Sequence, residues 1–223
     1  MSNNSELKLR ETSIERTSTY IKEVDKNNSN NIYTEILFAL NNASYVAIDL
    51  EMSGIGESVG ISIWRKSNQI AQLFEVYNYS LTCCPTTNFT ISPESASFLI
   101  KNGFDLNSPF KKGIPFIPCG LPREEQSGNK EMVPQCVLQE IFRAISASNT
   151  PIILHNGLMD ALFICFNFFC QLPDNLPDFC VLFTTFFPII YDTKEIAWVE
   201  ELNSNIKETI TWLEQFSFFG LNI

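Results

Sequence analysis

Two acidic residues, Asp49 and Glu51, stand two positions apart at the end of the apolar stretch YVAIDLE, residues 45–51. Successive side chains of a β-strand point to opposite faces, so these two carboxylates would share one face, about 7 Å apart. Two carboxylates at the end of a buried strand repel each other and lose hydration. We therefore expect a cation between them. The alternative interpretation is an exposed strand end whose acids simply face water.

A third acid, Asp160, lies in the first turn of a predicted helix that is apolar on nearly all sides, NGLMDALFICFNFFC. The helix dipole favours an acid at that place, which is the structural alternative. In such apolar surroundings, however, a carboxylate must be paired, protonated or bound to a cation. The preceding strand, TPIILH, ends at His155, and ligands collect near the carboxyl ends of strands in α/β sheets. Three acids from two strand ends form an oxygen-rich site suited to Mg²⁺ or Mn²⁺.

The elements that must position these acids follow from hydrophobic periodicity and from turn and cap residues. We expect a flexible arm over residues 1–30 and one domain over 31–223 that is incomplete at its C-terminal end. The predicted elements are a helix over 32–40, strands over 45–51, 59–66 and 69–81, a helix between Ser92 and Gly103, a loop over 109–134, a helix over 135–148, a strand over 150–155, helices over 156–170 and 180–187, a strand over 188–191, and helices over 192–202 and 206–220. A hairpin followed by strands that alternate with helices indicates an α/β domain with a mixed five-stranded sheet flanked by helices.

Composition and charge exclude several classes of protein. The formal net charge is −10, with 15 Lys and Arg against 25 Asp and Glu, which argues against binding nucleic acid through a broad basic surface. The 7 cysteines form no CxxC pair and there is 1 histidine, so zinc-finger spacings are absent. We interpret the thiols as reduced in an intracellular protein, nuclear or cytoplasmic. The most apolar run, residues 161–170, is too short to span a bilayer, and we expect no membrane partner.

The stretches AIDLEMSGIG and LHNGLMDALFICFNFF resemble the first and second motifs of the DEDD-type 3′–5′ exoribonucleases. The resemblance is to their deadenylase branch, that of poly(A)-specific ribonuclease and target of EGR, also called CAF-one family ribonucleases. ESASFLIKNGFDLNSPFKKGIPF and IIYDTKEIA resemble two further stretches of this branch, so the likeness runs from about residue 32 to 200. It implies a ribonuclease-H-like fold, two divalent metal ions, and hydrolysis of adenylated RNA from the 3′ end. It leaves the formation of a homo-oligomer open.

The resemblance also assigns roles to individual residues. Asp49, Glu51 and Asp160 would be the catalytic residues and would bind two Mg²⁺ or Mn²⁺ ions, which activate the attacking water and steady the leaving 3′ oxygen. The residues that would bind the substrate RNA are Met52 and Ile55, packed on the terminal base, and Asn156 and Lys194. For Met52 and Ile55, ordinary core packing is the alternative.

Two departures from the family pattern bear on activity. The family has a fourth metal-binding Asp and a nearby general-base His. Here His155 belongs to the second motif, and Asp192 matches a strand-end position that would cap the next helix with Thr193. Only Glu57-Ser58 stand where the family has a longer basic segment. We therefore expect this chain to be a poor nuclease. The open alternatives are a nuclease-dead RNA-binding or scaffolding module, a piece of a longer active enzyme, and an unrelated acidic protein with a structural metal.

We predict that Mn²⁺ binds weakly between Asp49, Glu51 and Asp160, because an uncompensated charge at the end of an apolar element is costly. Isothermal titration calorimetry should show a binding heat for the wild type and none for Asp49→Ala. Identical Mn²⁺ binding by the two proteins would show that these acids are not the ligands.

Overall fold

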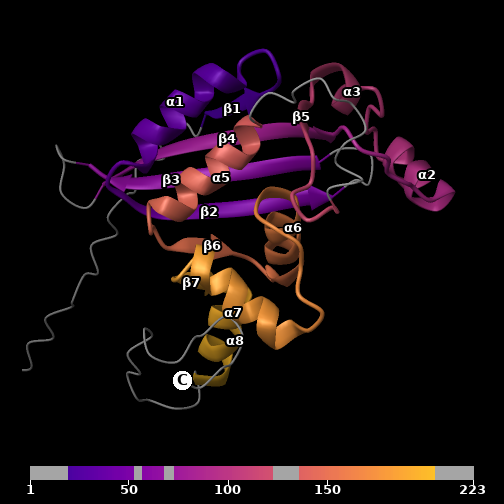
Figure 1. The fold of residues 1–223 in the computed structure, drawn as a ribbon. Coiled ribbons are helices and arrows are strands. Elements are labelled where there is room, and N and C mark those ends of the chain that lie inside the picture. The colour runs from indigo at the N-terminus through magenta and orange to yellow at the C-terminus, as the bar shows by residue number, and fades with distance from the viewer. Residues whose placement is uncertain (1–19, 53–56, 68–72, 123–135, 204–223) are drawn as a thin grey trace, which may run out of the picture.

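The computed structural model describes residues 20–52, 57–67, 73–122 and 136–203 of the chain. A mixed sheet runs through this part in the strand order β1-β4-β3-β2-β6-β7, with β5 also paired to β4 (Figure 1). The strands are β1 (Ile21–Val24), β2 (Ala43–Met52), β3 (Glu57–Lys66), β4 (Phe74–Pro85), β5 (Ile114–Phe116), β6 (Ile152–Leu154) and β7 (Ile190–Asp192). The helices are α1 (Ser29–Leu40), α2 (Pro93–Lys101), α3 (Ser108–Lys112), α5 (Val137–Ala147), α6 (Leu158–Phe168), α7 (Leu176–Phe186) and α8 (Thr193–Asn203).

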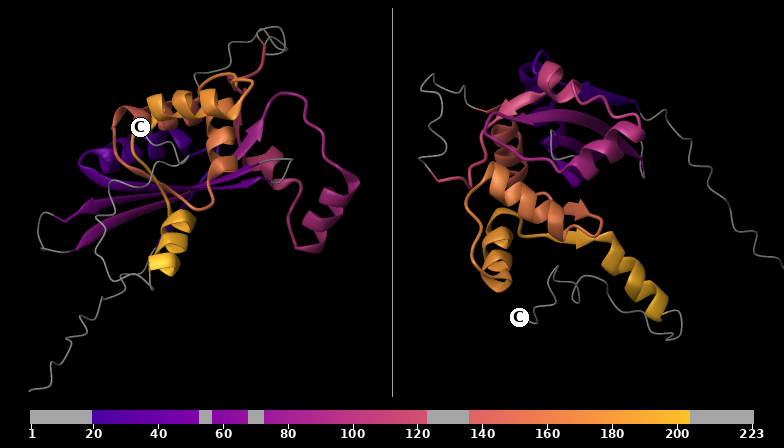
Figure 2. Two further views of the ribbon diagram at one scale, coloured as in Figure 1. Left: turned by 90° about the horizontal axis from the view of Figure 1, so that it is seen from below. Right: turned by 90° about the vertical axis from the view of Figure 1, so that its right-hand side faces the viewer.

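The helices are unevenly divided between the two faces of the sheet. Seen from below in Figure 2, α1, α5 and α7 lie on one side, whereas α8 extends from the other. Alternation along β2 follows this division: Val46, Ile48 and Leu50 are buried beneath the helices, and Asp49 and Glu51 are exposed. Because successive side chains of a strand point to opposite faces, both acids point away from these helices, toward what we call the open face of the sheet.

Two strand pairings set the position of the acidic end of β2. β2 runs antiparallel to β3, with Asp49 opposite Gly60 and Glu51 opposite Ser58. It also runs parallel to β6, with Val46 beside Ile152. Because parallel strands end at the same edge of a sheet, the helix that follows β6 begins near the last residues of β2.

Aromatic packing holds that helix, α6, in place. The apolar face of α5 buries residues at the helical spacing i, i+3, i+4 and i+7, which are Leu138, Ile141, Phe142 and Ile145. The ring of Phe142 stacks on that of Phe168 near the end of α6, with 4.3 Å between ring centroids. Phe168 also contacts Phe116 of β5. One ring thus joins α6 to the sheet and to α5.

The predicted N-terminal arm is wrong over its last residues. Ile21–Val24 form β1, which pairs in parallel with β4, and Val24 is only 1% exposed. The Lys22 ammonium and the Tyr79 hydroxyl both donate to the Glu35 carboxylate of α1. A strand of four residues is too short for an apolar period to reveal it, and its stability comes from the edge with which it pairs. Residues 1–19 lie outside the described part.

The predicted number of strands, five, is also wrong, since seven are paired in the described ranges. The outer edge of β4 takes β1 along residues 78–81 and then β5 along 83–85. β5 and α3 lie in the stretch predicted as loop, where prolines and glycines hide their short apolar runs. α7 begins before the predicted helix because the Asn175 side chain accepts from the Asp178 backbone N–H and caps it.

The remaining predicted elements within the described ranges are confirmed, including the Ser92 cap of α2 and the left-handed Gly103 after it (φ 79°). The predicted helix over 206–220 lies outside these ranges. None of the helices in the described ranges is both long and apolar enough to cross a membrane.

We predict that Phe142→Ala destabilises the fold by about 3–5 kcal/mol, the usual cost of removing a buried aromatic ring. Urea unfolding followed by circular dichroism measures it. The control is Phe98→Ala on α2, where the ring is 66% exposed and the change should be within about 0.5 kcal/mol. Equal losses from the two substitutions would contradict the role given to the Phe142 ring.

Candidate active site

The three predicted acids occupy different environments at the same edge of the sheet. Asp49 and Glu51 are exposed near the end of β2. Asp160 lies in the first turn of α6 and is only 8% exposed. Gly60, opposite Asp49, brings no side chain, so the space beside the Asp49 carboxylate on the open face stays clear.

The electrostatics of Asp160 show that these acids affect one another. Burial raises the pKa of the Asp160 carboxyl, and the negative charges of Asp49, Asp192 and Glu51 raise it further, to about 6 from its usual 3.8. The charged groups that shift this pKa are all acids, so the cluster carries excess negative charge near neutral pH. A divalent cation is the ordinary way to compensate such a group.

Asp192 is a structural acid. Its Oδ1 accepts from the backbone N–H groups of Asn156 and Lys194, both at 2.9 Å, and its Oδ2 accepts from Gly157 at 2.8 Å. Burial alone would raise the pKa of Asp192, but the backbone donors outweigh burial and lower it. The side chain caps the start of α8, as the sequence suggested, and also holds the turn before α6. It thereby positions Asp160.

His155 is held by a hydrogen bond that determines which of its nitrogens carries the proton. The Thr193 hydroxyl donates to the Leu154 carbonyl at 3.2 Å, so it accepts from His155 Nδ1 at 2.9 Å. In the neutral ring Nδ1 therefore carries the hydrogen and Nε2 carries a lone pair. No residue in the described ranges bonds to Nε2. The ring lies at the end of β6, beside the open face that also holds Asp49.

The predicted RNA-binding residues are brought together in part. Lys194 Nζ donates to Asn156 Oδ1 at 2.9 Å, and both side chains are exposed. Asn156 has a left-handed backbone (φ 54°), which turns the chain from β6 into α6. Met52 is the last residue of β2, and Ile55 lies outside the described residues. Their contacts with a base therefore stay predictions.

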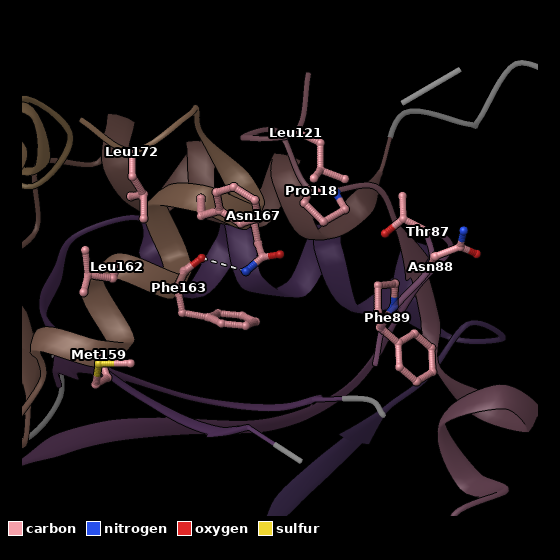
Figure 3. Close-up of a pocket in the computed structure, with 12 residues that line it drawn as sticks. Thr87, Asn88, Phe89, Pro118, Leu121, Met159, Leu162, Phe163, Asn167 and Leu172 are labelled. Atoms are coloured by element: carbon pink, nitrogen blue, oxygen red, sulfur yellow. Dashed lines mark hydrogen bonds between the residues drawn. The ribbon is translucent and has the colours of Figure 1, made fainter. Parts of the chain in front are cut away.

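Two hollows adjoin the acids. One, of about 660 Å³, is on the open face of the sheet, and both apolar and polar residues line it, the polar ones including Asp49, Ser62 and His155. The other, of about 740 Å³, lies between α6 and the loops that follow β4 and β5 (Figure 3). Sequence reasoning missed the second hollow. Its one signal in the sequence was Asn167, a polar residue in the otherwise apolar stretch that follows Asp160.

The oxygen ligands suit Mg²⁺ or Mn²⁺, and the raised pKa of Asp160 is relieved by a cation. In the conformation of the described residues, no group of three or more His, Cys, Asp or Glu is close enough to hold an ion jointly. The chemistry of the three acids therefore fits a metal, whereas their joint coordination of an ion is a proposal.

The fold and the positions of the three acids define the class of protein. A mixed sheet with two acids at one strand end and a third on the helix after the neighbouring strand is the arrangement of ribonuclease-H-like nucleases. The family pattern described as CAF1 family ribonuclease matches residues 24–59, 57–130 and 120–217. The chain belongs to this family, in the deadenylase branch of the DEDD nucleases, and the predicted family and fold class are confirmed.

Relatives and solved structures agree with this assignment. Poly(A)-specific ribonuclease PARN from Xenopus laevis is 35% identical over 78 residues, which are 34% of this chain and 12% of that protein. The RNase domain of yeast Pop2 superposes with a TM-score of 0.54 at 16% identity, over 83% of this chain and 73% of that one. The Mg²⁺- and Mn²⁺-bound form of Pop2p from S. pombe gives 0.53 at 15% identity, over 85% and 83%. CAF1 co-crystallised with the yeast NOT1 MIF4G domain gives 0.54 at 14% identity, over 85% and 75%.

The raised pKa of Asp160 predicts an unusual pH dependence of stability. The folded protein binds this proton more tightly than the unfolded chain does, so the contribution of Asp160 to stability falls as pH rises from about 4 to about 6. In EDTA and at about pH 7.5, Asp160→Asn should be more stable than the wild type, and the difference should shrink at about pH 5. Thermal melts across this range measure it.

The control for this experiment is Asp174→Asn, an exposed acid in the loop after α6. It should keep the pH profile of the wild type. Identical profiles for the wild type and Asp160→Asn would show that burial and the neighbouring acids do not destabilise the ionised Asp160 carboxylate.

Proposed function

We propose that this chain is a metal-dependent 3′–5′ exoribonuclease of the deadenylase type, which removes nucleotides from adenylated RNA 3′ ends. The observation that carries the proposal is the burial of Asp160 among other carboxylates, which raises its pKa to about 6. Such an arrangement is costly for stability and useful for holding divalent cations. The metal-bound form of Pop2p from S. pombe, which shares the fold, supports the same reading.

In this proposal Asp49, Glu51 and Asp160 hold Mg²⁺ or Mn²⁺. When bound, two ions supply charge that activates the attacking water and stabilises the leaving 3′ oxygen. The chain itself supplies the positioning: Asp192 holds the turn before α6, and Gly60 leaves room beside the Asp49 carboxylate. His155 is the single histidine of the chain, and in its neutral form Nε2 is unprotonated, so we assign it the role of proton acceptor.

The proposal gives Lys194 a part in binding RNA. The chain has a net charge of −10, so a phosphate group would approach the site only where a cation offsets that charge. Lys194 places its ammonium at the end of the sheet where Asn156 holds it, 2.9 Å away. We assign the pair to the RNA backbone, and Met52 and Ile55 to the terminal base. A MIF4G-type protein partner, as in the CAF1 complex with NOT1, and an intracellular location belong to the same proposal.

A second candidate function is that of an RNA-binding module without nuclease activity. It is favoured by the observation that, within the described residues, no three candidate ligands are close enough to share an ion. This module would use the same face and the same Lys194 contact.

The test is Mg²⁺-dependent shortening of 5′-labelled oligo(A). The wild type should remove nucleotides from the 3′ end slowly, and Asp160→Asn should be at least about 10²-fold slower, because the loss of a group that handles charge or protons in the transition state typically costs that much. Asp174→Asn should match the wild type. Oligo(A) that is bound but not shortened by the wild type would reject the nuclease and favour the second candidate.

A further inference from the structure

The cavity under α6 begins next to the acids. Met159, Phe163 and Asn167 line it from α6 at the spacing i, i+4 and i+8, so one face of the helix forms a wall. Met159 directly precedes Asp160, which places that end of the wall at the candidate active site. Figure 3 shows the opposite side formed by Phe89 and its neighbours in the loop after β4.

The walls of this cavity are fixed by hydrogen bonds and close packing. The loop after β5 donates from the backbone of Gly120 to the Phe166 carbonyl at 2.7 Å, and from Cys119 to the Asn167 carbonyl at 3.1 Å. A Cβ atom on Gly120 would lie 2.2 Å from the Phe166 ring, so only glycine permits this approach. The Phe163 ring meets Phe168 of the core edge to face. The cavity is therefore built by the fold.

Asn167 lines the cavity with an amide group of which only one end has a hydrogen-bond partner among the described residues. It is only 5% exposed, and its Nδ2 donates to the Phe163 carbonyl at 2.9 Å. Because a carbonyl can only accept, this bond determines which end of the amide is nitrogen. No described residue donates to Oδ1, which Figure 3 shows directed away from Phe163 toward the side of Phe89. A buried acceptor without a donor is costly unless a ligand supplies one.

We propose that this cavity binds a nucleobase of the RNA, and that Asn167 selects a base that carries an exocyclic amino group. The inference rests on the proposed function, since it takes RNA as the substrate. The residues that line the cavity are apolar, aromatic or neutral, and none is Lys or Arg, so they suit a base and not a phosphate. The exocyclic amino group of adenine or cytosine donates to Oδ1, whereas uracil carries a carbonyl oxygen at the corresponding ring position, which repels Oδ1.

The size and the aromatic lining of the cavity suit a base. A volume of about 740 Å³ accepts a purine with room to spare, and aromatic side chains provide faces on which it can stack. The apolar side chain of a protein partner would fill the same space but leave Oδ1 without a donor. Because Met159 adjoins Asp160, the base belongs to a nucleotide close to the bond that is cleaved. Asn167 is thus a specificity-determining residue.

Fluorescence anisotropy with labelled oligo(A), oligo(C) and oligo(U), in EDTA to prevent hydrolysis, tests the proposal. The wild type should bind oligo(A) and oligo(C) more tightly than oligo(U). Asn167→Leu should weaken oligo(A) binding roughly 3- to 10-fold, the value of one hydrogen bond, and change oligo(U) less than about 2-fold. The matched control is Asn102→Leu, which removes the same kind of bond, Nδ2 to the Phe98 carbonyl at 2.8 Å, from an exposed helix end. It should change neither.

A second variant keeps the proposal testable if Asn167→Leu folds poorly. Thr87→Trp fills the cavity from its half-buried rim and should abolish the preference for oligo(A). Equal binding of oligo(A) and oligo(U) by the wild type overturns the proposal. An A-to-U ratio that survives both variants also overturns it. The measurement needs no metal, so a chain that binds oligo(A) through Asn167 but hydrolyses nothing keeps the base site and rejects the nuclease.

Discussion

Negative charge that the fold places beside an apolar helix is the constraint on which the rest of this structure depends. Asp160 is buried in the first turn of α6, and every acid that influences its pKa raises it. Such an arrangement opposes folding near neutral pH unless a cation offsets it. The aromatic core around Phe142 and Phe168 and the pairing of β2 with β6 supply the stability that lets the acids stay there.

Asp192 and Asp160 lie in different electrostatic environments, and their pKa values shift in opposite directions. Asp192 is neutralised by backbone N–H groups from Asn156, Gly157 and Lys194, and its pKa falls. Asp160 has no such donors among the described residues, and its pKa rises. The contrast explains why one carboxylate can serve as a permanent structural tie between two helices. The other is left with a charge that a metal or a proton must satisfy.

The proposed recognition of RNA cannot rest on a broad basic surface, because the net charge is −10. The structure offers three local features instead: the acids that suit cations, the ammonium of Lys194 held by Asn156, and a neutral aromatic cavity beside Met159. Each would recognise a different part of a nucleotide, respectively the phosphate that reacts, the backbone and the base. A chain of this charge would then bind only the few nucleotides at the site.

The sequence alone determined the elements that carry a strong period and the acids at their ends. The strand that ends in Asp49 and Glu51 and the helix that begins near Asp160 were predicted because periodicity and caps are local properties. Only the tertiary structure decided what depends on neighbours far along the chain. β1 and β5 form because β4 offers each of them an edge. Asp192 joins two turns because both approach it. The Asn167 oxygen, which no described residue contacts with a donor, lies in a cavity that two distant loops enclose. No local pattern reports such contacts, because the free energy that forms them comes from residues brought together only on folding.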